Sequence, residues 1–176
     1  RVSLENFGVS TPTTELTKQV IDVTRPNVSF EQMTIDVYNS RVYLAGKHTW
    51  EPIVLNLRED VNNNVQKLVG EQLQKQFDFY EQSSAASGQD YKFVTRIEIL
   101  DGGNGANVPN VLETFELYGC YCESANYNSL AYSNSTDPVS VTLNIRYDNA
   151  IQSPQGTGIG TAIGRTTGTS VTGGGA

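Results

Sequence analysis

The stretch that decides the fold runs over residues 40–56 and reads S-R-V-Y-L-A-G-K-H-T-W-E-P-I-V-L-N. A strand-like run over 41–45 stops at Gly46, and a short polar stretch then leads to Trp50. Apolar and polar residues alternate after the tryptophan, which is typical of a strand with one buried face. The stretch therefore predicts a hairpin whose strands cover 41–45 and 51–58.

A long amphipathic helix is predicted directly after this hairpin. Asp60 is a residue type that often caps the first turn of a helix, and apolar side chains recur at helical spacing over residues 61–80. This apolar stripe consists of Val61, Val65, Leu68, Val69, Leu73, Phe77 and Tyr80. A single stripe on an otherwise polar segment indicates a helix that flanks the sheet and buries one side.

Three further strands are predicted, at 92–100, 111–122 and 139–147. The last has the clearest alternation, because apolar residues occupy every second position from Val139 to Tyr147. In the middle strand, a strict period of two places Phe115, Leu117 and Tyr121 on one face, and on the other Glu116, Tyr118, Cys120 and Cys122. These elements predict a mainly β fold, an antiparallel β-sandwich or barrel with one flanking α-helix over about 61–80.

The segments before the hairpin are less regular. Residues 1–16 are polar and predict an irregular N-terminal arm, and residues 17–23 predict a strand. Residues 24–40 carry more apolar side chains than a disordered linker normally does, namely Val28, Phe30, Met33, Ile35, Val37 and Tyr38. We expect an extended loop or ribbon that buries these side chains against something else.

The chain is long enough for one domain with a real core, which we predict over 17–150. Residues 151–176 are rich in glycine, threonine and serine, a composition that alone gives a flexible coil. If this C-terminal extension is ordered, a single small domain offers too little surface to hold it. Contacts with neighbouring chains are therefore expected there.

The net charge of −7 argues against tight binding of nucleic acid, because affinity for phosphates comes mainly from lysine and arginine. It does not exclude DNA as cargo, since a negative wall repels DNA and lets it slide. The sequence has no long apolar run, so we predict no transmembrane helix and no membrane partner.

No residue set predicts catalysis, a cofactor or a metal site. His48 is the single histidine, and nothing resembles a nucleophile elbow. Glu113 and Glu116 lie three apart on a strand and face opposite sides, so they do not form a glycosidase pair. The glycine-rich run 101–107 lacks the spacing of a calcium loop, and a hairpin turn explains it better. An enzyme is therefore the least favoured class.

The two cysteines, Cys120 and Cys122, lie at positions i and i+2 of a predicted strand. Their Cα atoms are then ~6.6 Å apart with roughly parallel side chains, near the upper limit for a disulfide. Two thiols are also too few to bind zinc. Two interpretations stay open: a pair of reduced thiols, or a bridge to a neighbouring subunit.

Three segments together resemble the tail-tube proteins of contractile-tailed, T-even-like bacteriophages, a family related to pyocin tubes and the type VI secretion tube protein. The first is R-V-Y-L-A-G-K-H-T-W at 41–50, similar to the family's Arg-x-x-x-Ala-Gly-x-x-Thr-aromatic hairpin. The second is the strand followed by Asp60 and its helix. The third is T-F-E-L-Y-G at 114–119 followed by the strand at 139–147. The resemblance covers roughly residues 17–148.

The resemblance implies six copies in a ring, with the inner strands of the ring forming one continuous barrel around a lumen. It also implies that rings stack through a long loop between early strands, which maps to residues 24–40. The predicted ring-stacking residues are Pro26, Val28, Phe30, Met33 and Ile35. Glu98 and Glu116 are the candidates for an acidic lumen wall, past which DNA moves without specific binding.

The function that the resemblance implies is that of a structural conduit in the virion, assembled in the host cytoplasm. Its implied partners are further copies of itself, a contractile tail sheath, and the baseplate, tape-measure and tail-terminator proteins. One alternative is a secretion-system or pyocin-type tube that carries protein effectors. The alternative from another class is a carbohydrate-binding β-sandwich, which needs an exposed aromatic platform and no six-fold assembly.

Overall fold

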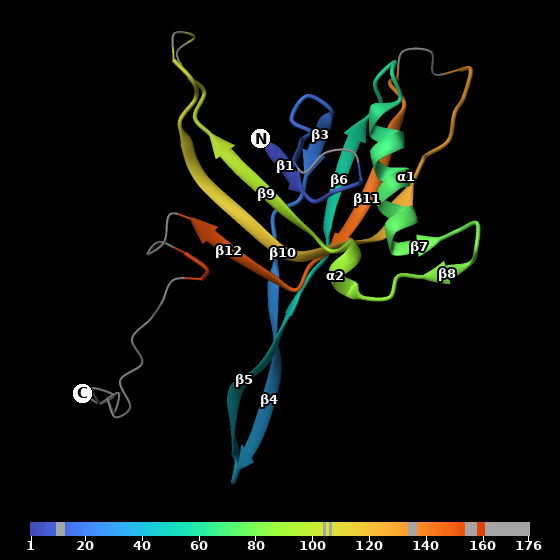
Figure 1. Cartoon of the computed structure of the whole chain (residues 1–176). Helices are drawn as coiled ribbons and strands as arrows, with labels where there is room; N and C mark the ends of the chain where they lie inside the picture. Colours follow the sequence, from blue (N-terminus) through green and yellow to red (C-terminus); the bar gives the residue numbers. More distant parts are fainter. Residues whose placement is uncertain (10–12, 104, 106, 134–136, 154–157, 161–176) are drawn as a thin grey trace.

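The computed structural model describes residues 1–9, 13–103, 105, 107–133, 137–153 and 158–160. Figure 1 shows a twisted β body with one long helix at its side and a two-stranded hairpin that projects far from it. The elements are β1 (Val2–Glu5), β2 (Thr13–Glu15), β3 (Val20–Val23), β4 (Val28–Val37), β5 (Ser40–Trp50), β6 (Ile53–Arg58), α1 (Asn64–Gln76), β7 (Phe77–Asp78), β8 (Ser83–Ser84), α2 (Gly88–Tyr91), β9 (Phe93–Leu100), β10 (Val111–Asn126), β11 (Ser140–Arg146) and β12 (Asn149–Ser153).

The body consists of two antiparallel sheets that share the long strand β10. The first sheet contains β2, β1, β9, the first part of β10, and β12. The second contains the last part of β10, then β11, β6 and β3. The prediction of a mainly β, antiparallel fold is confirmed.

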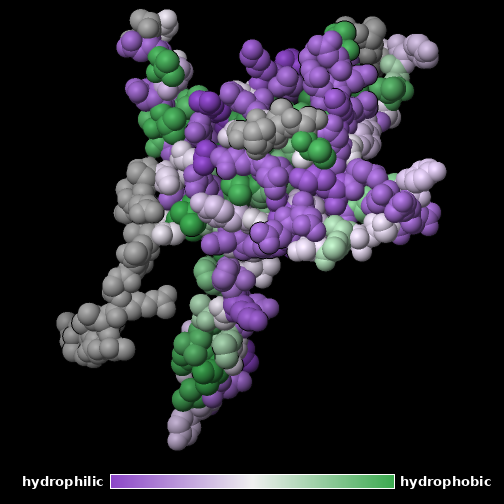
Figure 2. All heavy atoms as spheres, in the orientation of Figure 1, coloured by the Kyte–Doolittle hydropathy of each residue, from purple (hydrophilic) through white to green (hydrophobic). Residues whose placement is uncertain are grey.

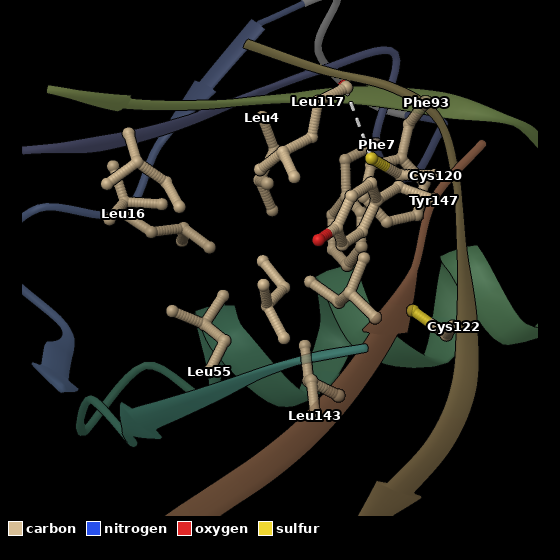
Figure 3. Close-up of a cluster of buried hydrophobic side chains, with 14 of the residues drawn as sticks. Leu4, Phe7, Leu16, Leu55, Phe93, Leu117, Cys120, Cys122, Leu143 and Tyr147 are labelled. Carbon is tan, nitrogen blue, oxygen red and sulfur yellow. Dashed lines mark hydrogen bonds between the residues drawn. The ribbon is translucent and has the colours of Figure 1, made fainter. Parts of the chain in front are cut away.

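The hydrophobic core lies between the two sheets, as expected for strands with alternating burial. In Figure 3, Leu4, Leu117 and Phe93 point from the first sheet toward Leu55 and Leu143 of the second. The core comprises Val2, Leu4, Phe7, Leu16, Trp50, Ile53, Leu55, Leu57, Val65, Val69, Phe93, Ile97, Phe115, Leu117, Cys120, Cys122, Val141, Leu143, Ile145, Tyr147 and Ala150.

Helix α1 is fastened to the body by two glutamine side chains as well as by its buried valines. Gln72 is fully buried, accepts a hydrogen bond from the Gly8 amide at 3.0 Å and donates to the Tyr91 carbonyl at 2.7 Å. The amide of Gln76 pairs with both backbone groups of Cys122, at 2.9 and 3.0 Å. The helix is therefore hydrogen-bonded both to the chain segments next to β1 and β9 and to the last part of β10.

The helix is shorter than the predicted range of 61–80, and its expected cap is wrong. Asp60 accepts a hydrogen bond from the next residue at 2.7 Å, so it closes a local turn. Asn63, with a left-handed φ of 54°, precedes the first helical residue instead. At the other end Phe77 turns to an extended backbone and starts β7, which leaves Tyr80 exposed.

The predicted hairpin of 41–45 with 51–58 is also wrong, because these strands have other partners. β5 continues through Gly46 to Trp50 and pairs with β4. β6 pairs with β11 and β3 instead. The pairing of β4 with β5 shifts its register near Gly46 and then continues, so that the polar residues 47–49 remain within the strand. The predicted loop at 24–40 is therefore mostly a long, regular β-ribbon.

The first residues do not form an irregular arm. Val2 and Leu4 alternate with polar residues in β1 and are buried, and Phe7 packs edge-on against Phe93 with ring centroids 5.0 Å apart. At the other end of the domain, β12 carries residues 149–153 back onto β10. The rest of the predicted extension, residues 154–157 and 161–176, lies outside the described residues.

Gly119 resets which residues of β10 face the core. Phe115 and Leu117 are buried as predicted, yet Cys120 and Cys122 are buried as well, although they have the opposite parity. The register with β9 shifts between Leu117 and Cys120, and Gly119 has a positive φ of 67°. The predicted shared face of Glu116, Tyr118, Cys120 and Cys122 is therefore split.

Candidate assembly surfaces

The β4–β5 hairpin is the largest feature that the body does not cover. The two strands form a sheet of their own, and ten residues of β4 at ~3.3 Å each span roughly 33 Å. Figure 1 shows this sheet projecting below the body. At its tip, Tyr38 has a φ of 49° and its side chain is fully exposed.

One face of the hairpin is apolar over its outer half, except for Ser40 opposite Val37 near the tip. Met33 lies opposite Leu44, and Ile35 lies opposite Val42, so their side chains project to the same side. Val37 follows on that side, and all five residues are exposed to between 44% and 56%. We call Met33, Ile35, Val37, Val42 and Leu44 the apolar hairpin face; the green atoms on the projection in Figure 2 include this region.

The opposite face of the hairpin is largely polar. It carries the cross-strand pair of Thr34 and Tyr43, and the pair of Asp36 and Arg41, whose charged groups lie 3.0 Å apart. A ribbon with one polar and one apolar face can pack its apolar face against another surface and keep its polar face in water. Because contiguous exposed apolar patches mark interaction sites, we identify the apolar hairpin face as the principal candidate site.

The base of the hairpin is anchored by a row of rings. Phe30 lies 6.3 Å from His48, His48 lies 6.1 Å from Trp50, and Trp50 lies 5.6 Å from Tyr147, all measured between ring centroids. Trp50 and Tyr147 are buried in the core, so this row connects the projecting ribbon to the body. The Glu51 amide adds a hydrogen bond to the chain just before β4.

The five predicted ring-stacking residues lie in two environments. Pro26 is buried and Val28 is half-buried against the core, so both belong to the base of the hairpin. Phe30, Met33 and Ile35 are exposed. Val42 and Leu44 were not predicted as members of this surface, although their alternation with Tyr43 indicates one apolar face.

The second candidate surface is the outer face of the first sheet. Arg96 lies between two glutamates, with its guanidinium 3.0 Å from Glu116 and 3.1 Å from Glu5. Glu98 is paired with Arg1 at 3.5 Å. The predicted lumen residues Glu98 and Glu116 therefore lie on the same sheet, but they do not meet, because Arg96 occupies the position opposite Glu116.

Hydrogen bonding keeps Glu116 ionised within this charged sheet face. The Tyr118 hydroxyl donates to its carboxylate at 2.6 Å, and this bond, followed by the contact with Arg96, lowers the pKa of Glu116. The face is thus a mixed network of glutamates and arginines, with the acidic residues in excess, rather than a bare acidic wall.

The outer face of the second sheet has a different chemistry. Asn56 donates to Asp22 at 2.7 Å and accepts from the Thr142 hydroxyl at 2.6 Å. Asn144 donates to Ser124 at 2.7 Å. These cross-strand bonds make a ladder of amide, hydroxyl and carboxylate groups, and Arg146 adds an ion pair with Glu123 at 3.4 Å.

Both cysteines lie in the core, each less than 5% exposed and neither in a disulfide. Burial raises the pKa of Cys120 to about 11 and that of Cys122 to about 12, so both are neutral thiols near pH 7. Because neither sulfur lies at the surface of the folded chain, the structure favours reduced thiols over a bridge to a neighbouring subunit.

We expect both thiols to be protected from a soluble thiol reagent while the protein is folded. Labelling with dithionitrobenzoate at neutral pH should proceed only as fast as the chain opens, and both thiols should react at once in denaturant. Labelling of one thiol in the native protein at the rate of a free thiol would show that the core is open at β10.

Among the residues that the structure places, no three His, Cys, Asp or Glu side chains are grouped so as to hold a metal ion. Within the same ranges, no helix is both long and apolar enough to cross a membrane.

The fold is similar to that of chains from contractile injection assemblies. No family model matches the sequence, and no curated protein matches it. A chain of the six-fold symmetrised baseplate of the anti-feeding prophage is 13% identical, with a TM-score of 0.59 over 86% of this chain and 91% of that one. A chain of the extended sheath–tube complex of the PVC extracellular contractile injection system is 14% identical, with a TM-score of 0.57 over 86% and 87%. The crystal structure of an Hcp protein gives 10% identity and a TM-score of 0.51 over 86% and 90%. At these low sequence identities the comparisons show similarity of fold alone.

Proposed function

We propose that this chain is the structural subunit of a hollow tube, built from stacked hexameric rings, in a contractile injection machine. The observation that carries the proposal is the apolar hairpin face, which its own chain leaves exposed on a projecting, firmly anchored ribbon. A contiguous exposed apolar surface of this kind marks a site that another molecule covers. Stacking of rings through this ribbon provides that cover.

The fold similarity supports the same function. The proteins with this fold include chains from a baseplate and from a sheath–tube complex. In the finer form of the proposal, the chain forms the tail tube of a phage virion, assembled in the host cytoplasm. A contractile sheath surrounds the tube, and baseplate, tape-measure and tail-terminator proteins adjoin it. A secretion or pyocin-type tube is the alternative within the same architecture.

The contact between rings is proposed for the apolar hairpin face, where Met33 and Ile35 keep the role predicted from the sequence and Val42 and Leu44 join them. Phe30 keeps its predicted role at the base of the hairpin, where it is exposed beside His48. Pro26 and Val28 act indirectly, since they are packed at the base and hold the ribbon in place.

For the lumen, we propose that the charged sheet face points inward. Glu98 and Glu116 remain the acidic members, with Arg1 and Arg96 bound among them. Arginines that are already paired with carboxylates have little capacity left for phosphates. A wall with excess acidic charge then lets DNA pass without holding it.

The carbohydrate-binding alternative is not favoured by the arrangement of the tyrosines. Tyr147 is buried in the core, and Tyr118 donates its hydroxyl to Glu116 on the charged sheet face. Tyr127 and Tyr132 lie instead in the segment between β10 and β11. These side chains do not form one exposed platform for a sugar.

Negative-stain electron microscopy of the purified protein, concentrated at neutral pH, tests the proposal. Hollow tubes or stacked rings with six-fold end views are expected. A protein that stays monomeric at every concentration would refute the tube function, and glycan binding would then be the next property to test.

A further inference from the structure

If the apolar hairpin face docks on another molecule, a surface must receive it. A hollow of about 600 Å³ lies in the segment that connects β10 to β11. We call it the loop hollow; it is lined by residues 127–132 and 137–140. Nothing in the function proposed above uses this hollow.

The loop hollow has a fixed scaffold. Asn128 adopts a left-handed φ of 53°, which turns the chain away from β10. Its side-chain amide donates to the carbonyl oxygen of Ser140 at 3.0 Å and to the Ser140 hydroxyl at 2.9 Å. The two lining segments are therefore tied together at the start of β11, so part of the hollow is preformed.

The lining is mixed: Asn128, Ser129, Asp137 and Ser140 are polar, and the apolar and aromatic side chains among them face solvent. Leu130 and Tyr132 are the most exposed of them, and Tyr127 and Val139 are exposed to about 40%. Large hydrophobic side chains around a concave surface bind a convex apolar element. The apolar hairpin face, a ridge of aliphatic side chains on a narrow ribbon, has the complementary shape and chemistry.

The two surfaces lie at opposite ends of the molecule. In Figure 1 the hairpin projects at the bottom, and the orange segments that flank the start of β11 lie at the top right. One chain therefore does not bring its own ridge into its own hollow. Two copies placed head to tail do so, and a head-to-tail contact leaves a free ridge and a free hollow for the next copy.

We propose that the loop hollow of one copy receives the apolar hairpin face of the copy in the next ring. This inference rests on the proposed tube function and names the surface that its stacking contact uses. A head-to-tail contact continues without limit along an axis, as a tube requires. Pairing of two hairpins face to face would close after two copies and would not extend.

Disulfide trapping between two variants that each gain one cysteine tests this proposal. Ile35→Cys places a thiol on the apolar hairpin face, and Leu130→Cys places one in the loop hollow. A disulfide requires Cβ atoms ~4 Å apart, so it reports direct contact. The variants are mixed, concentrated under assembly conditions and oxidised with diamide. The native thiols are buried and give little background, which the unchanged protein measures.

A cross-linked dimer is expected in the mixture and not with either variant alone. The matched control replaces Ile35→Cys by Thr34→Cys, one residue away on the polar face of the same strand, and its mixture with Leu130→Cys should lose the dimer. Dimers of Ile35→Cys alone would overturn the proposal in favour of paired hairpins.

The remaining outcomes separate this inference from the proposed function. Stacked rings in the microscope without any cross-link in the mixture would refute the loop hollow as the receiver and leave the tube function standing. Absence of both assembly and cross-link would refute both. Saturable binding of an oligosaccharide to the monomer, lost in Leu130→Cys, would identify the hollow as a sugar site and would also overturn the proposal.

Discussion

The double variant Ile35→Glu with Val42→Lys is expected to stay folded and to lose assembly. The two residues lie directly opposite each other on the apolar hairpin face, so the new charges pair across the ribbon and preserve it. In an assembled tube the same charges would have to leave water. Analytical ultracentrifugation should find a monomer or an isolated ring at concentrations where the unchanged protein forms long particles.

The expected size of this effect follows from the apolar surface that is lost. Fully burying one aliphatic side chain of this size contributes about 1.5–3 kcal/mol, but Ile35 and Val42 are only 45% and 46% exposed in the free chain, so covering both contributes roughly 1.5–3 kcal/mol at each contact. Every tenfold change in affinity corresponds to about 1.4 kcal/mol, so the contact is expected to weaken by about ten- to a hundredfold. A ring of identical subunits repeats that loss around its circumference.

The matched control carries the same charges on the other side of the ribbon. Thr34→Glu with Tyr43→Lys is also a cross-strand pair, one residue along on each strand, and it alters the polar face. This control is expected to assemble like the unchanged protein, and both variants should have the circular dichroism spectrum of the folded chain. Equal assembly of both variants would show that the apolar face is not the contact.

Local patterns in the sequence were sufficient for several strands. The alternation over 139–147 predicted the buried face of β11, because the period of two follows from strand geometry alone. Local patterns did not predict which strands pair with each other. β5 pairs with β4, although β6 is equally close in the sequence, and no local pattern distinguishes these choices.

Glycine gave misleading local signals in two places. Gly46 was interpreted as the end of a strand, but it lies within β5, where a Cβ atom would stand 3.0 Å from the Glu31 carbonyl oxygen. The glycine thus permits close approach at a register shift. In β10, Gly119 reverses the parity that the alternation predicts, which explains why both cysteines moved to the core.

The segment 24–40 was expected to bury its apolar side chains against something else. The structure leaves Phe30, Met33 and Ile35 exposed, and their burial by another molecule stays a prediction. The one-sided arrangement of the segment depends on the register with β5, which the two-residue turn after Val37 sets. The loop hollow was not predicted, because it depends on how the single connection between β10 and β11 folds back on itself and on the hydrogen bonds from Asn128 to Ser140, which no local pattern indicates.

Gly119→Ala is expected to destabilise the whole domain. At this position β10 leaves β12 and begins to pair with β11, and the backbone has a φ of 67°. A Cβ atom would stand 2.2 Å from a carboxylate oxygen of Asp148, which is held by Lys92 at 2.5 Å. The left-handed conformation alone costs about 1–2 kcal/mol, and displacing Asp148 adds to it. A loss of roughly 2 kcal/mol corresponds to a melting temperature about 4–8 °C lower.

Gly70→Ala provides the matched control, because it is the same substitution in an unconstrained place. Gly70 lies in α1 with no atom within 4 Å of an added Cβ. Alanine favours the helix by about 1 kcal/mol, so this variant should melt about 2–4 °C higher. Opposite shifts of the two variants in calorimetry would locate the strain at the junction of the two sheets. A Gly119→Ala protein that melts with the unchanged chain would show that β10 does not need its left-handed residue, and the parity reversal would then need another cause.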